Sequence, residues 1–176
     1  MAKSTRQHVF EGMELLPEGL IPFVEKRLDS SVKGHWQVEV VQRVHGLKPN
    51  GDGQVAWDQQ GLLKTMMAFW KDAFAMVLGH PERSYVSELL DVRNKLSHNE
   101  TFSYDDAERA LDTMRRLLES VSAKEVAEKI SAARDTILRT KYTELQRNEE
   151  RRKTQRAAIS VETVAGLMPW RDVVEP

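Results

Sequence analysis

Apolar residues recur at three- and four-residue steps along most of the chain, and this spacing predicts a succession of amphipathic helices. The segment 36–44 also alternates like a strand, but no other segment could pair with it, so a short helix is favoured. We expect helices over about residues 8–28, 36–44, 57–78, 82–97, 103–121 and 123–145, the last continuing to about residue 158. The sequence therefore predicts an all-α helical bundle with four core helices, a first helix and a protruding C-terminal helix.

Helix breakers and caps refine this pattern. Pro17 and Pro22 interrupt the first segment, so we expect a kink there or two short helices. Gly79 ends the apolar run before it, and Pro81 suits the first turn of the next helix. Two further predicted helices begin with a serine that is followed three residues later by an acidic residue, and the sequence predicts an N-terminal cap at both. These are Ser103 with Asp106 and Ser122 with Glu125.

The last part of the chain changes in composition. Residues 146–156 are almost all charged or polar, which indicates a solvated helix rather than an RNA-binding arm. Residues 159–176 are apolar again but too short for a domain. We therefore expect a bundle over residues 1–158 and, over 159–176, a linker or the start of a following domain.

Composition narrows the class of protein. The chain is 40% hydrophobic and 30% charged, with a net charge of -1, so no global basic field points to nucleic acid. It lacks cysteine, which fits a reducing cytosol. Neither a signal peptide nor a membrane-spanning apolar run is evident, so we expect a cytoplasmic protein without a membrane partner. Trp57 and Trp70 fall at core spacing and are predicted to be core anchors.

Several common catalytic motifs are absent from the sequence. It contains no P-loop, no dinucleotide-binding Gly-x-Gly-x-x-Gly and no Gly-x-Ser-x-Gly elbow. The five histidines show no metal-ligand spacing. The sequence thus predicts neither a cofactor nor a metal.

One polar stretch stands out at the end of the segment 82–97. It reads Arg93-Asn94-Lys95-Leu96-Ser97-His98. Asn94 and His98 are four residues apart and share a helix face. Arg93 and His98 are separated by about 140° around an ideal helix, so they converge only if the helix loosens near Ser97. An ordinary structural interpretation also exists, in which Arg93 pairs with Asp91 or Glu88 and His98 caps the last carbonyls.

In its bundle context this stretch resembles the signature of the HEPN superfamily of ribonucleases and toxins: an arginine, a polar residue, three further residues and a histidine. The segment Ser87–Asn99 looks like HEPN domains at the N-termini of large P-loop ATPases in bacterial phage-defence loci. The segment Gly166–Val174 looks like the junction into such an ATPase. The resemblance implies a homodimeric, metal-independent endoribonuclease of a defence or toxin-like system, with RNA as its substrate.

The same resemblance implies roles for individual residues. Arg93, Asn94 and His98 would be catalytic, with two copies of the motif facing each other across a dimer. His98 can act as base or acid because imidazole titrates near pH 6.5, and Arg93 offers a fork matched to phosphate. Further residues could support the site, by orienting His98 or raising its pKa in the case of the carboxylates. They are Glu88, Asp91, Ser97 and Glu100.

Two features count against parts of this hypothesis. Glu100 stands where the toxin branch controlled by nucleotide transfer carries a tyrosine, so modification there is not supported. The nearby carboxylates also oppose binding of RNA phosphate. An alternative function is a non-catalytic module that dimerises or docks a following ATPase.

Overall fold

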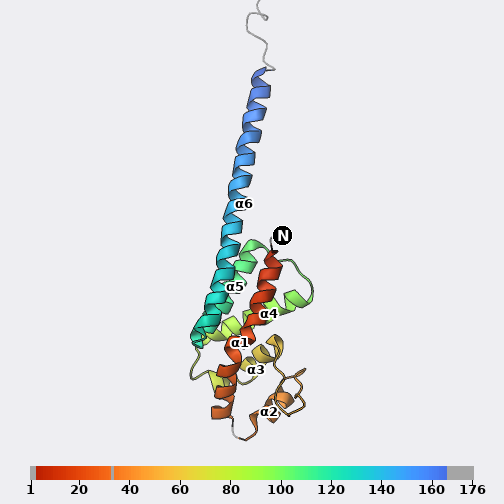
Figure 1. Cartoon of the computed structure of the whole chain (residues 1–176), viewed down its shortest axis with the longest axis vertical. Helices are drawn as coiled ribbons and strands as arrows, with labels where there is room; N and C mark the ends of the chain where they lie inside the picture. Colours follow the sequence, from red (N-terminus) through yellow and green to blue (C-terminus); the bar gives the residue numbers. More distant parts are fainter. Residues whose placement is uncertain (1–2, 33, 166–176) are drawn as a thin grey trace, which may run out of the picture. The chain divides into compact units, whose positions relative to one another are not determined.

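The structure is a computed structural model that describes residues 3–32 and 34–165, with side chains described to Arg156. Helices make up most of these residues (Figure 1). In chain order they are α1 (Thr5–Ser31), α2 (Trp36–Arg43), α3 (Gln59–Ala68), the π-helical turn η1 (Trp70–Phe74), α4 (His80–Ser97), α5 (Tyr104–Ser120) and α6 (Lys124–Ala165). Over the described residues no strand forms, and one isolated bridge joins Pro49 to Val55. The predicted all-α class is confirmed.

The first helix is longer than predicted and is continuous across both prolines. A single helix, α1, runs from Thr5 to Ser31 through both Pro17 and Pro22, so the prediction of two short helices is wrong. Each proline removes one backbone donor from the ladder. Burial of the apolar face on either side, at Leu16, Leu20 and Val24, compensates for this loss. A kink at the prolines stays a prediction.

The predicted helix over 57–78 is also corrected. It is interrupted after Ala68, and a π-helical turn over Trp70–Phe74 follows. The Ala75 N–H donates to the Trp70 carbonyl at 2.7 Å, which closes the wider turn. The apolar face of this segment is broad, and the extra turn allows Phe69, Trp70 and Phe74 to be buried together with the residues of α3.

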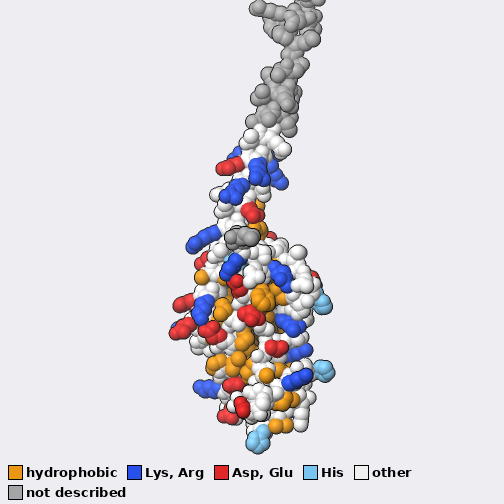
Figure 2. Space-filling model, turned by 45° about the vertical axis from the view of Figure 1, so that its right-hand side comes forward, with side chains coloured by type: hydrophobic (Ala, Val, Ile, Leu, Met, Phe, Trp, Pro, Cys, Tyr) orange, Lys and Arg blue, Asp and Glu red, His pale blue; other side chains and the backbone are white. Residues whose placement is uncertain are grey.

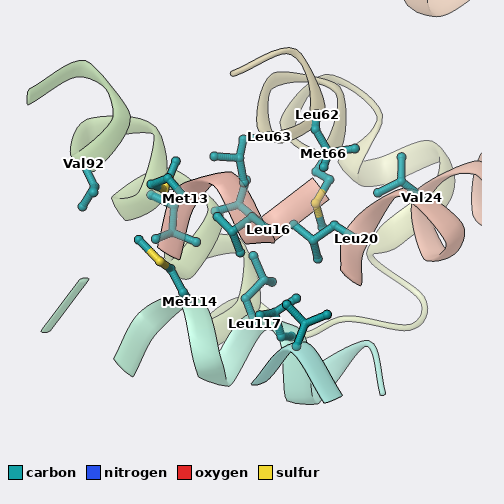
Figure 3. Packing of buried hydrophobic residues seen from close by; sticks show 14 of the residues in the cluster. Met13, Leu16, Leu20, Val24, Leu62, Leu63, Met66, Val92, Met114 and Leu117 are labelled. Atoms are coloured by element: carbon teal, nitrogen blue, oxygen red, sulfur yellow. The ribbon is translucent and has the colours of Figure 1, made fainter. Parts of the chain in front are cut away.

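The core lies where α1 packs between α3 and α5 (Figure 3). Met13, Leu16 and Leu20 of α1 face Leu63 and Met66 on one side, and the side chains of α5 on the other. Two glycines permit the close approach of α1 to α5. A β-carbon at Gly12 would lie 2.9 Å from Leu111, and one at Gly19 would lie 2.4 Å from Leu118.

The tryptophans take the predicted places. Trp70 is buried, with 6% of its surface exposed. Trp57 is half-buried, stacks on Trp36 with ring centroids 6.3 Å apart, and donates its indole N–H to Glu25 at 2.9 Å. Both therefore serve the packing of the bundle, as predicted.

Of the two predicted helix caps, the one at the start of α5 forms and the one at the start of α6 does not. At the start of α5, the Ser103 hydroxyl accepts the Asp106 N–H at 3.1 Å and the Asp106 carboxylate accepts the Ser103 N–H at 3.3 Å, which confirms the capping box. At its end, Ser122 has a φ of 65°, which is not the geometry of an N-cap. The predicted capping box at Ser122 is wrong, because this residue instead completes the turn that terminates α5.

The chain divides into two compact units, Met1–Leu138 and Arg139–Pro176. In the second unit the helix continues to Ala165, and every described side chain from Tyr142 to Arg156 is exposed. This exposure fits the predicted solvated helix over 146–156. The domain boundary at 158/159 stays a prediction, and Gly166–Val174 lie outside the described residues. None of the helices in the described part of the chain has the length and apolar character needed to cross a membrane.

Candidate functional site

The motif occupies the last turns of α4, whose opposite face is packed into the bundle. Val86, Leu89, Val92 and Leu96 are buried against the core. At the start of the helix, the Gly79 N–H donates to the Glu82 carboxylate at 2.7 Å. The buried apolar face fixes the rotation of α4 about its axis. It thereby leaves the polar residues between these positions on the outer surface.

The helix ends in a Schellman motif directly after the predicted site. The His98 N–H donates to the Asn94 carbonyl at 3.1 Å, so His98 is the C-cap. The Asn99 N–H donates to Leu96 at 3.2 Å and the Glu100 N–H to Lys95 at 3.0 Å. Asn99 has a φ of 56°, a left-handed conformation that asparagine tolerates better than most residues. The condition for convergence within one chain, a helix that loosens near Ser97, is therefore not met.

A pocket of about 560 Å³ lies beside the motif. Asn94 and His98 both line it, as their shared helix face predicts, whereas Arg93 does not. Its walls come from α4, from the connection after His98 and from the first turns of α5, which packs against α4 (Figure 1). The lining residues are Glu88, Asp91, Val92, Asn94, Lys95, His98, Glu100, Phe102, Asp106, Arg109 and Ala110.

The pocket carries four carboxylates and two cations. Arg109 donates from Nε to Glu88 Oε1 at 2.6 Å and from Nη2 to Glu88 Oε2 at 3.3 Å, and the Glu88 hydrogen bond raises the pKa of Arg109. A hydrogen bond from the Ser103 hydroxyl, the Ser103 N–H and the charge of Lys95 together lower the pKa of Asp106. The lowered pKa favours the ionised form of Asp106, and the Glu88 carboxylate is paired with the Arg109 guanidinium.

Three of the four predicted supporting residues line the pocket, and Ser97 does not. Asp91 and Glu100 line the pocket with His98. Glu88 also lines it, but its carboxylate is bound to Arg109. The Ser97 hydroxyl donates to the Arg93 carbonyl at 2.9 Å, which satisfies it within the helix.

Two residues at the start of α1 hold the connection after the motif, and sequence reasoning missed both. Arg6 donates from Nη2 to the Leu96 carbonyl at 3.0 Å and to Asn99 Oδ1 at 2.8 Å. The Thr5 hydroxyl donates to the Phe102 carbonyl at 2.7 Å. Each contact joins residues at least 90 positions apart, so no local pattern could have indicated them.

The surface of the bundle shows no extended field of one sign on the face seen in Figure 2, where Lys and Arg side chains alternate with Asp and Glu side chains. This agrees with the net charge of -1. Any attraction of this face for an anion must therefore come from individual cations rather than from a basic patch.

A protein-family model for Swt1-like HEPN domains matches residues 11–122, which is more than half of the chain. The chain belongs to the Swt1-like HEPN family. The matched region of this HEPN chain contains the whole pocket and all of the motif, but not Arg6. The resemblance to HEPN proteins is thereby confirmed. No curated protein and no solved structure matches the chain.

Proposed function

We propose that this HEPN domain is a metal-independent endoribonuclease that works as a homodimer. The observation that carries the proposal is the position of the motif residues in a chain of this family. Asn94 and His98 line one pocket, whereas Arg93 does not. A second copy would supply the Arg93 guanidinium and a second histidine.

The chemistry explains why two copies are needed. In RNA cleavage the 2′-oxygen attacks phosphorus and loses its proton to a base, while the 5′-oxygen leaves and takes a proton from an acid. A cation stabilises the charge that develops on the phosphorane. One chain offers one histidine in the motif, so paired motifs provide the base and the acid. The products are a 2′,3′-cyclic phosphate and a free 5′-hydroxyl.

The test removes each proposed catalytic group in turn. His98→Ala and Arg93→Ala are each expected to lower the cleavage rate about 100-fold or more in EDTA, because a positioned acid–base group contributes roughly 10²–10⁴-fold. Cleavage of a single-stranded RNA pool is followed on gels, with the 2′,3′-cyclic end identified by mass spectrometry. Wild-type rates in both variants would refute the proposal.

Mixing the two variants tests the dimer. If Arg93 of one chain acts with His98 of the other, a mixed dimer has one intact Arg93–His98 pair and should cleave faster than either variant alone, but more slowly than the wild type because it lacks the second histidine. If the two residues act within a chain, the mixture stays inactive. Neither variant replaces a buried side chain, so circular dichroism should show both folded.

We further propose that the nuclease belongs to an anti-phage or toxin-like system and precedes a P-loop ATPase. The support is the resemblance of Gly166–Val174 to such a junction. Plaque counts on cells that carry the wild-type full-length protein should be lower than on cells that carry His98→Ala. Equal counts would contradict the defence role.

The excess of carboxylates in the pocket favours one other function. Four carboxylates line the pocket with His98, and the pKa of one of them, Asp106, is lowered. Such a pocket weakens the attraction for RNA phosphate and would suit a non-catalytic module that only dimerises or docks a following ATPase. A folded dimer that cleaves no RNA in the pool would support this function over the nuclease.

A further inference from the structure

The pocket beside the motif contains a cation that the HEPN signature does not include. Arg109 belongs to α5, 16 residues beyond Arg93, and lies on the wall opposite the motif helix. Arg93 does not line this pocket, and among the described residues the Lys and Arg side chains that line it with His98 are Arg109 and Lys95. Only Arg109 has the planar fork that binds two oxygens of a phosphate group together.

The Arg109 guanidinium is hydrogen-bonded to Glu88 and is also exposed to solvent. Its Nε and Nη2 groups donate to the two oxygens of Glu88, at 2.6 Å and 3.3 Å. These bonds use two of the five N–H donors of a guanidinium, which leaves about three free. Its side chain is 76% exposed, and in the described part of the chain Glu88 is its one hydrogen-bond partner. Glu88 thus orients the group without occupying its remaining donors.

The other arginines of α5 are arranged differently. Arg115 donates to Asp112 and Glu119, and Arg116 donates to Asp112 at 2.6 Å. Neither of them lines the pocket. Arg116 therefore offers a matched comparison with Arg109: it is an exposed, ion-paired arginine on the same helix that lies away from His98.

We propose that Arg109 binds a phosphate group of the RNA strand in the pocket of His98, and that Glu88 is its positioning residue. This inference rests on the proposed function. Lys95 does not substitute for Arg109, because an ammonium is a point charge and its charge acts on the Asp106 carboxylate. Glu88, which could have oriented His98, acts on Arg109 instead.

The decisive experiment measures RNA binding without cleavage. In a His98→Ala background, a short fluorescein-labelled single-stranded RNA is titrated with the full chain and followed by fluorescence anisotropy. Adding Arg109→Gln is expected to weaken binding about tenfold or more, the effect of losing a charge-assisted hydrogen bond to phosphate. Adding Arg116→Gln removes the same net charge and is expected to change binding less than twofold.

Conservative variants separate a phosphate contact from a general effect of charge. Arg109→Lys keeps the charge but loses the fork, so binding should recover only in part. Glu88→Gln keeps the size of the side chain but weakens the hold on Arg109, so it should give a smaller loss than Arg109→Gln. Equal binding by the Arg109→Gln and Arg116→Gln proteins would overturn the inference.

The outcome is distinguishable from that of the proposed function. If His98→Ala abolishes cleavage and Arg109→Gln leaves binding unchanged, the nuclease stands and the role of Arg109 fails. If His98→Ala cleaves like the wild type but Arg109→Gln weakens binding, the phosphate contact stands and the catalytic assignment fails. In the active protein, Arg109→Gln should raise KM by about tenfold and Arg116→Gln should not.

Discussion

Helices α4 and α5 end in the same backbone geometry but are held there in different ways. After α4, the Asn99 N–H reaches the Leu96 carbonyl at 3.2 Å; after α5, the Ser122 N–H reaches Glu119 at 3.0 Å. Both end residues are left-handed, with φ of 56° and 65°. Among the described residues, a long-range side-chain contact is found at the end of α4 only, where Arg6 of α1 bonds the Leu96 carbonyl and the Asn99 side chain.

The two helix ends thus differ in the hydrogen bonds that hold them. The end of α5 leads through Ala123 into α6. Close to this end, Arg115 donates a hydrogen bond to Glu119 of the same helix at 2.6 Å. The end of α4 carries His98 and is fixed by a residue distant in sequence. Similar backbone turns can therefore differ in their long-range contacts, and the turn that is bonded to a distant helix lies at the candidate site.

The largest expected change in stability comes from removing the hydrogen bonds of Arg6 to the end of α4. Arg6→Ala should lower the free energy of unfolding by about 2 kcal/mol, because hydrogen bonds to a charged group contribute roughly 1.5–3 kcal/mol. Urea denaturation measures the loss. In hydrogen exchange, the amides of Asn99 and Glu100 should lose protection while those of Ser122 and Ala123 keep theirs.

Lys3→Ala provides the control for Arg6→Ala. Lys3 also lies near the start of α1 and pairs with Glu11 at 2.8 Å, but this pair is exposed and should leave the urea midpoint unchanged. Equal loss of protection at both helix ends in the Arg6→Ala protein would show that Arg6 does not act on α4 specifically.

A smaller effect of opposite sign is expected at the end of α5. Ser122→Gly should raise the free energy of unfolding by about 0.5–1 kcal/mol, since relief of roughly 1–2 kcal/mol in the left-handed region is partly offset by the entropy of glycine. Asn99→Gly should give no gain, because it also removes the bond from Arg6.

A double-mutant cycle checks this explanation. In an Arg6→Ala background the bond is already lost, so Asn99→Gly should become stabilising, as Ser122→Gly is. Thermal and urea unfolding of the four proteins give the coupling between Arg6 and Asn99. A coupling of zero would mean that the side-chain bond contributes nothing.

The smallest expected effect is a loss of stability in acid, which should be greater at the end of α5 than at the end of α4. Burial opposes ionisation of Asp112, but hydrogen bonds from Arg115 and Arg116 outweigh it and hold its pKa below 3.8. The ionised carboxylate therefore stabilises the fold above its unfolded pKa, and this contribution is lost as pH falls through the lower folded pKa. Arg6 bonds a neutral carbonyl and a neutral amide, which do not titrate there.

Hydrogen exchange below about pH 3.8 measures this response. Corrected for the intrinsic exchange rate, protection of the Ala123 amide should fall before that of the Glu100 amide. Asp112→Asn should remove most of this difference in acid sensitivity. A faster loss at Glu100 would contradict the assignment of Asp112 as the titrating support.

Much of the site was predictable because its signals are local. The four-residue spacing of Asn94 and His98 places them on one helix face, and both line the pocket. The cap of α5 at Ser103 follows from a serine and an acid three residues apart. The second predicted cap failed at Ser122, because the same residue types can end one helix as well as begin the next.

The longer-range features carried no such signal. Periodicity across 57–78 predicts one continuous helix, yet burial of Phe69, Trp70 and Phe74 is reached through a π-helical turn. The sequence pattern assigns no packing role to Gly12 and Gly19, although each permits the close approach of α5. Such features depend on which side chains meet across the core.

The amino-acid sequence by itself determined the all-α class, most helix boundaries and the motif with its family resemblance, because each depends on residues within a few turns of one another. Tertiary structure alone decided that Arg109 of α5 lies on the wall opposite the motif and pairs with Glu88 of α4, and that Arg6 of α1 bonds the end of α4. These arrangements follow from packing and hydrogen bonds between helices, over separations of 21 to 93 residues, which no local pattern records.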